Sequence, residues 1–349
     1  MDFIDLYAGI GGFRFAFDGN GANCVFSSEW NKYAQITYKA FHGELPYGDI
    51  HNIADIEKDI PDHDILAAGF PCQPFSLAGV SKKNSLGRLH GFDDPTQGTE
   101  FFKIKEILRI KKPSAFLLEN VKNLKSHDKG NTFRIISKAL NDVEYVFDTR
   151  IIDGAHWVPQ HRERIYFVGF RKDLEVTKDE ISKLFPEPPK ERIYELEDVI
   201  ISEEEMVRKY GDKYTLGLGT WNSLKRHKEN HAKKGNGFGF NLIQKPFNGK
   251  ITRTMSARYY KDGAEILIEQ NGAIPRRITP LEACKLQGFP ETCYDFFNGK
   301  LEQPVSDVQA YKQFGNSIAF PVVNEIAKNM TNFIKSNELL RNKDVLKAI

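Results

Sequence analysis

A cysteine between two prolines is the first candidate for a reactive group. Cys72 stands in the string Gly-Phe-Pro-Cys-Gln-Pro-Phe-Ser over residues 69–76, directly after an apolar run at 64–68 with strand character. The prolines stiffen the turn, and in an α/β sheet ligands bind where the strands end. A thiolate there would be a strong nucleophile. The alternative, a buried and inert thiol, is the commoner state of a lone cysteine, and the paired prolines argue against it.

A carboxyl group follows the next apolar run. Glu119 comes directly after residues 115–118, so a parallel sheet would place it beside Cys72 at the same edge. Two leucines precede it, and a carboxyl group in apolar surroundings has a raised pKa and can donate a proton. The alternative is an ordinary strand-end acid in solvent.

Glycines follow the first apolar run and suggest a ligand at the mouth of the sheet. Gly9 and Gly11 allow a sharp turn and close backbone approach, but Arg14 stands where a dinucleotide fingerprint needs its third glycine, which disfavours a dehydrogenase. About twenty residues on, Glu29 could accept bonds from ribose hydroxyls and Trp30 could stack on adenine. Together they suggest an adenosine cofactor; a surface acid and a core aromatic remain the alternative.

The pattern of the chain predicts the elements that must position these groups. Short apolar runs alternate with amphipathic stretches up to about residue 170, which is typical of a doubly wound α/β sheet. We expect strands at 3–7, 23–27, 64–68, 115–118, 144–152 and 164–170, and helices at 31–42, 101–110 and 132–140. The last two strands are joined by a loop too short for a crossover helix, so they should be antiparallel.

A change in composition marks a second domain. The proline-rich residues 185–189 indicate a linker, and between residues 224 and 262 ten basic residues face two acids, a local charge of +8 within a chain whose net charge is only +2. We expect a domain at 1–185, completed by 300–349 with a helix at 320–340, and a small, irregular, mainly β domain at 186–299.

Several classes of protein are disfavoured by composition. Four cysteines form no Cys-x-x-Cys pair, so neither a disulfide framework nor a zinc site is indicated. His227 and His231 are four residues apart, but a basic helix surface explains them better than a metal site, and we expect no metal. No apolar run approaches a membrane span, and the start of the chain does not resemble a signal peptide. We therefore expect a cytoplasmic protein.

The ordered motifs resemble those of the cytosine-C5 DNA methyltransferases of prokaryotic restriction-modification systems. The resemblance covers nearly the whole chain and rests on DLYAGIGG, SSEW, GDI, GFPCQPFS, ENV, PQHRER, RRITPLEACKLQGFP and YKQFGNSIAFP, in that order. It implies a Rossmann-like sheet with an antiparallel final strand and a small target recognition domain. It also implies methyl transfer from S-adenosylmethionine, leaving S-adenosylhomocysteine, to C5 of a cytosine flipped out of duplex DNA.

The resemblance assigns roles to individual residues. Cys72 would add to cytosine C6 and Glu119 would hold and protonate N3, while Arg162 and Arg164 look like the pair that holds the base O2 and a nearby phosphate. A surface strand with exposed charge is the alternative for that pair. The implied cofactor contacts are Tyr7, Gly9, Gly11, Glu29, Trp30, Asp49, Ile50, Pro71 and, from the far end of the chain, Asn316.

DNA contacts are expected from two regions. A long loop after residue 76, rich in glycine and lysine, would close over DNA beside the nucleophile unless it is a disordered insertion. In the basic second domain, residues 252–257 resemble the family's Thr-Leu recognition element, with methionine in place of leucine. The alternative for the basic cluster is a solvated helix face. The residues expected at DNA are Ser76, Lys82, Lys83, Arg88, Lys233, Lys234, Arg253, Thr254, Met255 and Arg258.

Some positions depart from the family pattern, and other functions stay open. Tyr7 stands where phenylalanine is usual, and Gln97 and Glu100 replace an arginine and a leucine, which leaves the adenine pocket undefined. Two other functions remain possible: a related enzyme that acts on transfer RNA, and a catalytically inactive protein, here called the silent regulator, that binds cofactor and DNA to regulate transcription. The main expected partner is double-stranded DNA. In a restriction-modification system a cognate restriction endonuclease is a further possible partner, one that would form no stable complex with this chain. Nothing in the sequence identifies that endonuclease or the recognition sequence.

Overall fold

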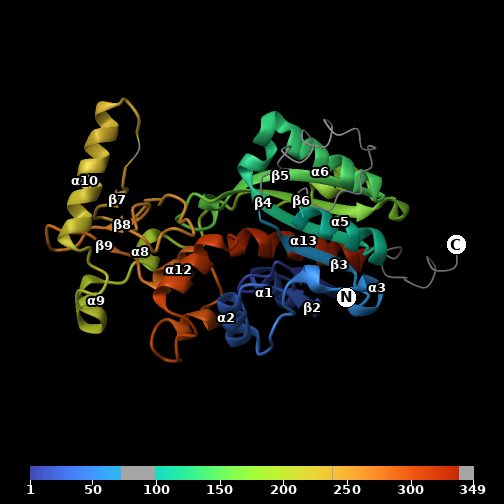
Figure 1. The fold of residues 1–349 in the computed structure, drawn as a ribbon, viewed down its shortest axis with the longest axis horizontal. Helices are drawn as coiled ribbons and strands as arrows, with labels where there is room; N and C mark the ends of the chain where they lie inside the picture. The colour runs from blue at the N-terminus through green and yellow to red at the C-terminus, as the bar shows by residue number, and fades with distance from the viewer. Residues whose placement is uncertain (72–98, 238, 338–349) are drawn as a thin grey trace, which may run out of the picture.

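A six-stranded mixed sheet forms the larger lobe of the molecule (Figure 1). The computed structural model describes residues 1–71, 99–237 and 239–337. The strands lie in the order β2-β1-β3-β4-β6-β5. Their bounds are β1 Asp2–Leu6, β2 Asn23–Ser28, β3 Ile65–Gly69, β4 Ala115–Val121, β5 Tyr145–Asp153 and β6 Glu163–Arg171. Strands β1 to β4 are parallel, and β6 runs antiparallel to both β4 and β5, which confirms the expected antiparallel end of the sheet.

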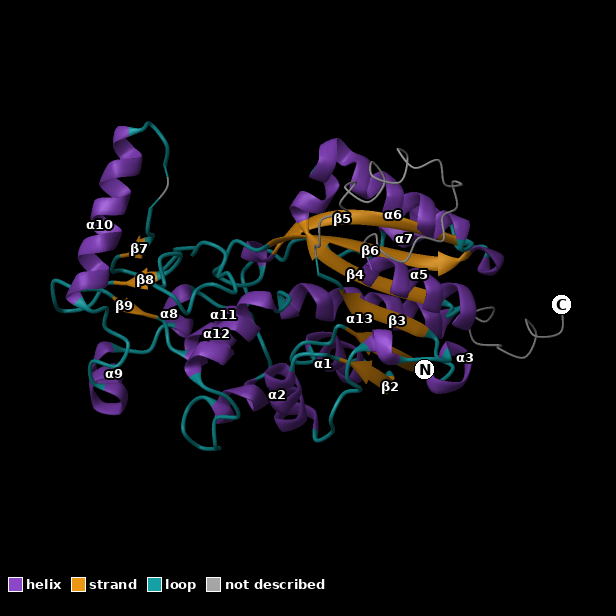
Figure 2. Cartoon of the chain, in the orientation of Figure 1, coloured by secondary structure: helices purple, strands orange, loops and turns teal. Residues whose placement is uncertain are grey.

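Helices cover both faces of this sheet because its buried strands alternate their side chains between two cores (Figure 2). On β3, Ile65 and Ala67 face one core, and Leu66 and Ala68 face the other. The first core is closed by α1 Gly12–Gly19, α7 Lys178–Ser182 and α13 Phe320–Ser336. The second is closed by α3 Ile56–Asp59, α5 Thr99–Lys111 and α6 Asn131–Asp142.

The expected strands and helices of the first 171 residues agree with the structure to within two residues at most ends, and α2 spans Lys32–His42. The C-terminal helix is a correction. We expected it to reach residue 340, but α13 ends at Ser336, and Asn337 already has extended backbone angles. Serine and asparagine are weak helix formers because their side chains compete for backbone hydrogen bonds, which accounts for the earlier end.

A smaller three-stranded sheet organises the second lobe. It consists of β7 Leu242–Ile243, β8 Leu267–Ile268 and β9 Arg276–Arg277. The helices of this region are α8 Leu196–Val199, α9 Glu203–Tyr210, α10 Leu218–Lys233 and α11 Pro280–Leu286. The expected second sheet is therefore present, but helices hold more of this region than strands do. The run 225–233 is rich in lysine, arginine and other good helix formers, and α10 packs its Trp221 and Leu224 against Leu267 of β8.

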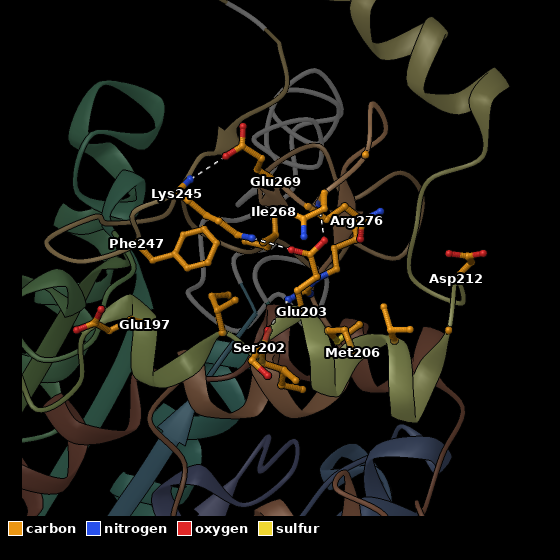
Figure 3. Close-up of a pocket in the computed structure, with 17 residues that line it drawn as sticks. Glu197, Ser202, Glu203, Met206, Asp212, Lys245, Phe247, Ile268, Glu269 and Arg276 are labelled. Atoms are coloured by element: carbon orange, nitrogen blue, oxygen red, sulfur yellow. Dashed lines mark hydrogen bonds and ion pairs between the residues drawn. The ribbon is translucent and has the colours of Figure 1, made fainter.

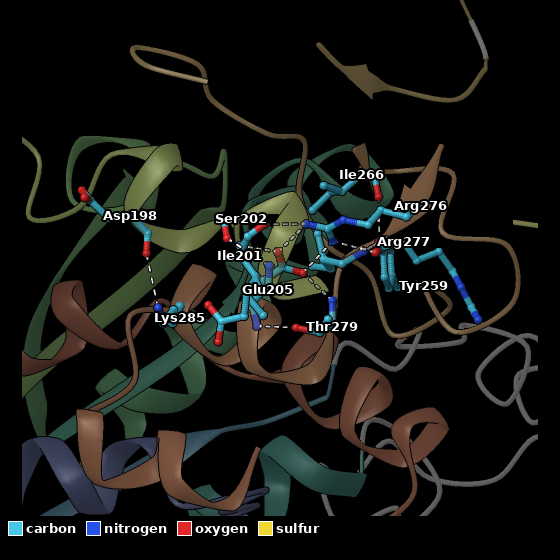
Figure 4. Close-up of polar contacts among 12 residues, drawn as sticks. Asp198, Ile201, Ser202, Glu205, Tyr259, Ile266, Arg276, Arg277, Thr279 and Lys285 are labelled. Carbon is cyan, nitrogen blue, oxygen red and sulfur yellow. Dashed lines mark hydrogen bonds and ion pairs between the residues drawn. The ribbon is translucent and has the colours of Figure 1, made fainter. Parts of the chain in front are cut away.

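A buried ion pair fixes the start of α11 (Figure 4). The guanidinium of Arg276 donates to both carboxylate oxygens of Glu282 at 2.8 and 2.9 Å. Thr279 and Glu282 form a capping box, with the Glu282 backbone N–H donating to the Thr279 hydroxyl at 3.1 Å. Glu282 also accepts from the backbone of Ile201 at 2.8 Å, which ties the segment before α9 to α11.

The C-terminal part of the chain returns to the larger lobe. Helix α12 Asp307–Asn316 packs on α2, where Gln313 accepts a hydrogen bond from Thr37 at 2.9 Å and donates to the Tyr33 carbonyl at 2.9 Å. Helix α13 then crosses beside α1 in Figure 1. Within the described residues, none of the helices combines the length and apolar character that a membrane crossing needs.

Candidate active site

The carboxyl ends of β3 and β4 lie side by side at one edge of the sheet. Gly69 pairs with Glu119 in the parallel register, and the chain then leaves β3 through Phe70 and Pro71. The side-chain amide of Asn120 donates to the Phe70 carbonyl at 2.8 Å and so fixes this exit. Cys72 follows Pro71 in sequence but lies outside the described residues, as do Ser76, Lys82, Lys83, Arg88 and Gln97.

Glu119 is buried and paired with Arg164. Its Oε1 lies 3.0 Å from Nε of Arg164, which β6 brings opposite the end of β4 through the pairing of Val121 with Arg164. Burial raises the pKa of the Glu119 carboxyl, and the charges of Arg164 and Arg162 oppose that rise. This environment would allow the Glu119 carboxyl to hold a proton and to donate it to a proton acceptor in the site.

Arg162 is buried and directs its guanidinium at backbone carbonyls. Only 1% of it is exposed, and its guanidinium donates to backbone carbonyls, including that of Met255 at 3.2 Å. Burial lowers its pKa to about 9, with the Arg164 charge acting in the same direction. The two arginines therefore have different partners: Arg164 pairs with the Glu119 carboxylate, and Arg162 donates to backbone carbonyls.

The glycine turn after β1 is held by Glu29. One carboxylate oxygen accepts from the Gly9 backbone N–H at 2.9 Å and the other from Asn31 at 2.7 Å. Burial raises the pKa of Glu29, and these backbone donors oppose the rise. Gly9 has a φ of +57°, and in the described part of the chain no atom lies within 4 Å of the Cβ that a larger residue would carry. The turn therefore leaves open space beside Glu29.

A second loop reaches the same edge of the sheet. Asp49 accepts from the His51 backbone at 2.9 Å and caps a short 3-10 helix that begins with the buried Ile50. His51 Nε2 lies 3.0 Å from Oε2 of Glu100 in the first turn of α5. The Tyr7 hydroxyl donates to the Glu100 carbonyl at 2.9 Å. Glu100, which departs from the family pattern, thus joins the expected cofactor loops to α5.

The remaining expected cofactor residues differ in exposure. Trp30 is 69% exposed, and Pro71 and Asn316 are exposed as well. Asn316 is the last residue of α12, and Gly11 caps α1. Gly11 has a φ of +83°, and a Cβ there would overlap the imidazole of His42, a buried contact that the sequence pattern did not indicate.

The expected DNA-reading residues of the second lobe differ in exposure. Lys233 and Lys234 end α10 and are exposed, as are Arg253 and Arg258. Arg253 donates to the Gly239 carbonyl at 2.8 Å. The Thr254 hydroxyl donates to the His161 carbonyl, and Met255 is fully buried in the core below. Met255 thus supports this segment from within and does not present its side chain at the surface.

Two further features contain none of the predicted site residues. A cavity of about 570 Å³ in the second lobe is lined by α9, by Lys245 and Phe247 and by residues 268–272 (Figure 3). On α10, the Nε2 atoms of His227 and His231 lie 3.1 Å apart. Among the residues that the structure describes, no group of three or more His, Cys, Asp or Glu side chains converges as metal ligands would.

Comparison with solved structures defines the class of fold. The chain is similar to the Dnmt2 methyltransferase of S. pombe, with a TM-score of 0.70 at 20% sequence identity over 95% of this chain and 99% of that one. The chain, with its mixed six-stranded sheet and smaller second sheet, therefore has a methyltransferase fold.

Comparison of sequences gives the family. The model for the C-5 cytosine-specific DNA methylase matches residues 1–332. The chain is 43% identical to the DNA-cytosine methyltransferase of Escherichia coli K12 over 98% of this chain and 80% of that protein. It is 50% identical to the type II methyltransferase M.SsoII of Shigella sonnei over 95% of this chain and 80% of that protein. The chain belongs to the C-5 cytosine-specific DNA methylases and is a DNA cytosine-C5 methyltransferase.

Proposed function

We propose that this enzyme transfers a methyl group from S-adenosylmethionine to C5 of a cytosine flipped out of a short, specific duplex sequence. The observation that carries the proposal is the position of Glu119, buried at the end of β4, paired with Arg164 and in register with the strand that leads into Cys72. A nucleophile, a proton donor and a guanidinium at one sheet edge are the groups that activation of a pyrimidine ring needs.

The reaction would proceed through a covalent adduct on the base. The Cys72 thiolate forms a bond to C6, and Glu119 donates its proton to N3, so that the electron pair of the C5–C6 double bond becomes available at C5. C5 would then attack the methyl group of the substrate S-adenosylmethionine, whose methyl–sulfur bond breaks to leave S-adenosylhomocysteine. Loss of the C5 proton to a base and expulsion of the thiolate restore the double bond, and N3 returns its proton. Arg164 would hold O2, and its ion pair with Glu119 would keep that carboxyl oriented.

The residues at the ends of β1 and β2 fit an adenosine cofactor. Glu29 is oriented by two backbone donors beside the open turn at Gly9, and Trp30 offers an exposed ring for stacking. Bound S-adenosylmethionine would supply an electrophilic sulfonium methyl group. The residues that would hold it are Tyr7, Gly9, Gly11, Glu29, Trp30, Asp49, Ile50, Pro71 and Asn316.

DNA would lie against the basic second lobe. Flipping a base out of the stack costs a few kcal/mol, which contacts to phosphate must offset. The exposed Lys233, Lys234, Arg253 and Arg258 supply positive charge there, with Thr254 in the same segment and Ser76, Lys82, Lys83 and Arg88 in the stretch after Cys72. This division assigns catalysis and cofactor binding to residues 1–185 with 300–349, and target recognition to 186–299.

The setting of the reaction follows from the DNA substrate and from the relatives. Type II relatives such as M.SsoII indicate a restriction-modification system, in which a cognate endonuclease cuts the unmodified sequence. A DNA substrate requires that the enzyme share a compartment with the chromosome, which in a bacterial cell is the cytoplasm. No metal takes part in the proposed chemistry.

Methyl transfer from labelled S-adenosylmethionine tests the proposal. Wild type, Cys72→Ser and the control Cys24→Ser are incubated with mixed genomic DNA and, separately, with transfer RNA, and the DNA is then sequenced after bisulfite treatment. We expect wild type and Cys24→Ser to mark cytosines at one short motif and Cys72→Ser to mark none. Labelling of transfer RNA alone would favour an RNA enzyme. Cofactor binding without labelling of either would favour a silent regulator.

A further inference from the structure

Three segments remote in sequence meet at the guanidinium of Arg162. Its Nη1 donates to the Met255 carbonyl at 3.2 Å, and its Nη2 donates to the carbonyls of Gly315, at 3.0 Å, and Ser317. These partners lie 93, 153 and 155 residues along the chain. One side chain before β6 thus joins the recognition segment 252–257 to the turn between α12 and α13.

The backbone around Arg162 reinforces this junction. Thr252 donates to the Pro159 carbonyl at 2.8 Å, and His161 donates to the Thr252 carbonyl at 3.0 Å. The side chain of Gln160 accepts from the Met255 N–H at 2.7 Å and donates to the Leu286 carbonyl at 3.2 Å. The recognition segment is therefore docked on residues 159–161, directly before the strand that carries Arg164.

The crossing of the recognition segment and α12 is tight. Gly315 is buried, and a Cβ on it would overlap the backbone of Ser256 and Ala257. Asn316, an expected cofactor contact, lies between the two residues whose carbonyls accept from Arg162. A shift of the recognition segment would therefore move the Asn316 turn as well.

Burial of Arg162 is costly unless its hydrogen bonds are made. It is 1% exposed, and its contacts described above are to neutral carbonyls and not to a carboxylate. A buried charge destabilises the fold unless its hydrogen bonds are made, so the geometry of these carbonyls matters in addition to the attraction of the nearby Glu119 carboxylate. The planar guanidinium donates to these three carbonyls from two separate nitrogens, whereas a lysine ammonium would have to reach them from a single nitrogen.

We propose that Arg162 is a positioning residue that holds the recognition segment 252–257 and the Asn316 turn on the strand bearing Arg164. It thereby fixes the positions of the DNA-reading segment and of the cofactor-binding turn relative to Glu119. The inference rests on the proposed function. It also gives the two arginines different roles: Arg164 contacts the base, and Arg162 acts through the backbone segments to which it donates hydrogen bonds.

The test compares Arg162→Lys with the matched control Arg276→Lys. Arg276 is also buried, but it donates to Glu282 and to the Ile201 carbonyl and not to the carbonyls that Arg162 holds (Figure 4). For each variant we would measure KM for DNA and for S-adenosylmethionine, the single-turnover rate at saturation, and kcat/KM on cognate duplex against a duplex with one altered base pair. Hydrogen exchange over 252–257 and 315–317 is measured on the same samples.

Arg162→Lys should accelerate exchange in both segments, raise both KM values and lower discrimination about tenfold, the effect of losing one or two hydrogen bonds. The saturated single-turnover rate should change less than KM.

A drop in that rate with both KM values and exchange unchanged would show that Arg162 contacts the base and would overturn the proposal. If Arg276→Lys lost as much discrimination between the two duplexes as Arg162→Lys, the loss would be a general effect of instability, and this result would also overturn the proposal. Failure of wild type to methylate DNA would refute the proposed function, whereas the exchange result tests the junction by itself.

Discussion

Nε of Arg164 lies 3.0 Å from Oε1 of Glu119, so the residue that we propose holds the base also lowers the proton affinity of the carboxyl beside it. Burial raises the pKa of Glu119 and the Arg164 charge lowers it. Arg164→Met should therefore raise that pKa further, and the protonated form should persist to higher pH. We expect the alkaline limb of the single-turnover rate to move to higher pH, although the maximum rate falls because the base loses a contact.

The control for this profile is Glu119→Gln, which removes the titrating group. It should lower the rate by about 10²- to 10⁴-fold, as expected for loss of a general acid, and flatten the alkaline limb. An alkaline limb that stays in place in Arg164→Met, or that persists in Glu119→Gln, would mean that another group controls proton transfer.

Gly9 and Gly11 should respond differently to alanine. Both have positive φ, which costs an alanine about 1–2 kcal/mol. Gly9→Ala points its methyl group into open space, so it should fold with a small loss of melting temperature but bind S-adenosylmethionine at least tenfold more weakly. Gly11→Ala overlaps His42 and should lose much more stability. Calorimetry and thermal unfolding measure the two effects; equal affinity for Gly9→Ala and wild type would place the cofactor elsewhere.

Glu100 links α5 to both loops expected at the adenosine. Its carboxylate pairs with His51 at 3.0 Å, and its carbonyl accepts from Tyr7. Glu100→Leu, which restores the residue usual in the family, keeps the Tyr7 contact but breaks the His51 pair. We expect a change of about two- to fivefold in cofactor affinity, because a half-exposed pair contributes at most about 1 kcal/mol. His51→Gln should give the same change, and the double variant no more. Additive effects would show that the pair does not act as a unit.

His42 should make the fold sensitive to acid. Burial lowers its pKa from 6.5 to about 3, so below pH 6.5 the unfolded chain takes up a proton that the folded chain does not. Its contribution to stability is therefore full above pH 6.5 and is lost as pH falls towards 3. In His42→Phe this loss disappears, and the melting temperature should fall less than that of wild type between pH 7.5 and pH 5. His156→Phe, at an exposed site, should behave like wild type.

The sequence predicted the sheet because its strands are apolar runs buried on both faces, and local pattern alone identifies such runs. Glu119 could be predicted at the end of its strand beside the end of β3, whereas its pairing with Arg164 depends on the register between β4 and β6. The contacts of Arg162 could not, since its three carbonyl partners are 93 or more residues away and backbone carbonyls carry no sequence signal. Likewise, no local pattern could show that Met255 is buried or that Glu100 pairs with His51.

The covalent adduct between Cys72 and cytosine C6 is the central claim, and a duplex with 5-fluorocytosine at the target base tests it most directly. Because fluorine cannot leave as the C5 proton does, the thiolate cannot be expelled after methyl transfer, and protein and DNA should remain joined. With S-adenosylmethionine present, mass spectrometry should find wild type linked to the duplex through the peptide containing Cys72, and no link for Cys72→Ser. Methylation of ordinary duplex by Cys72→Ser at the wild-type rate, or a link through another residue, would contradict the account.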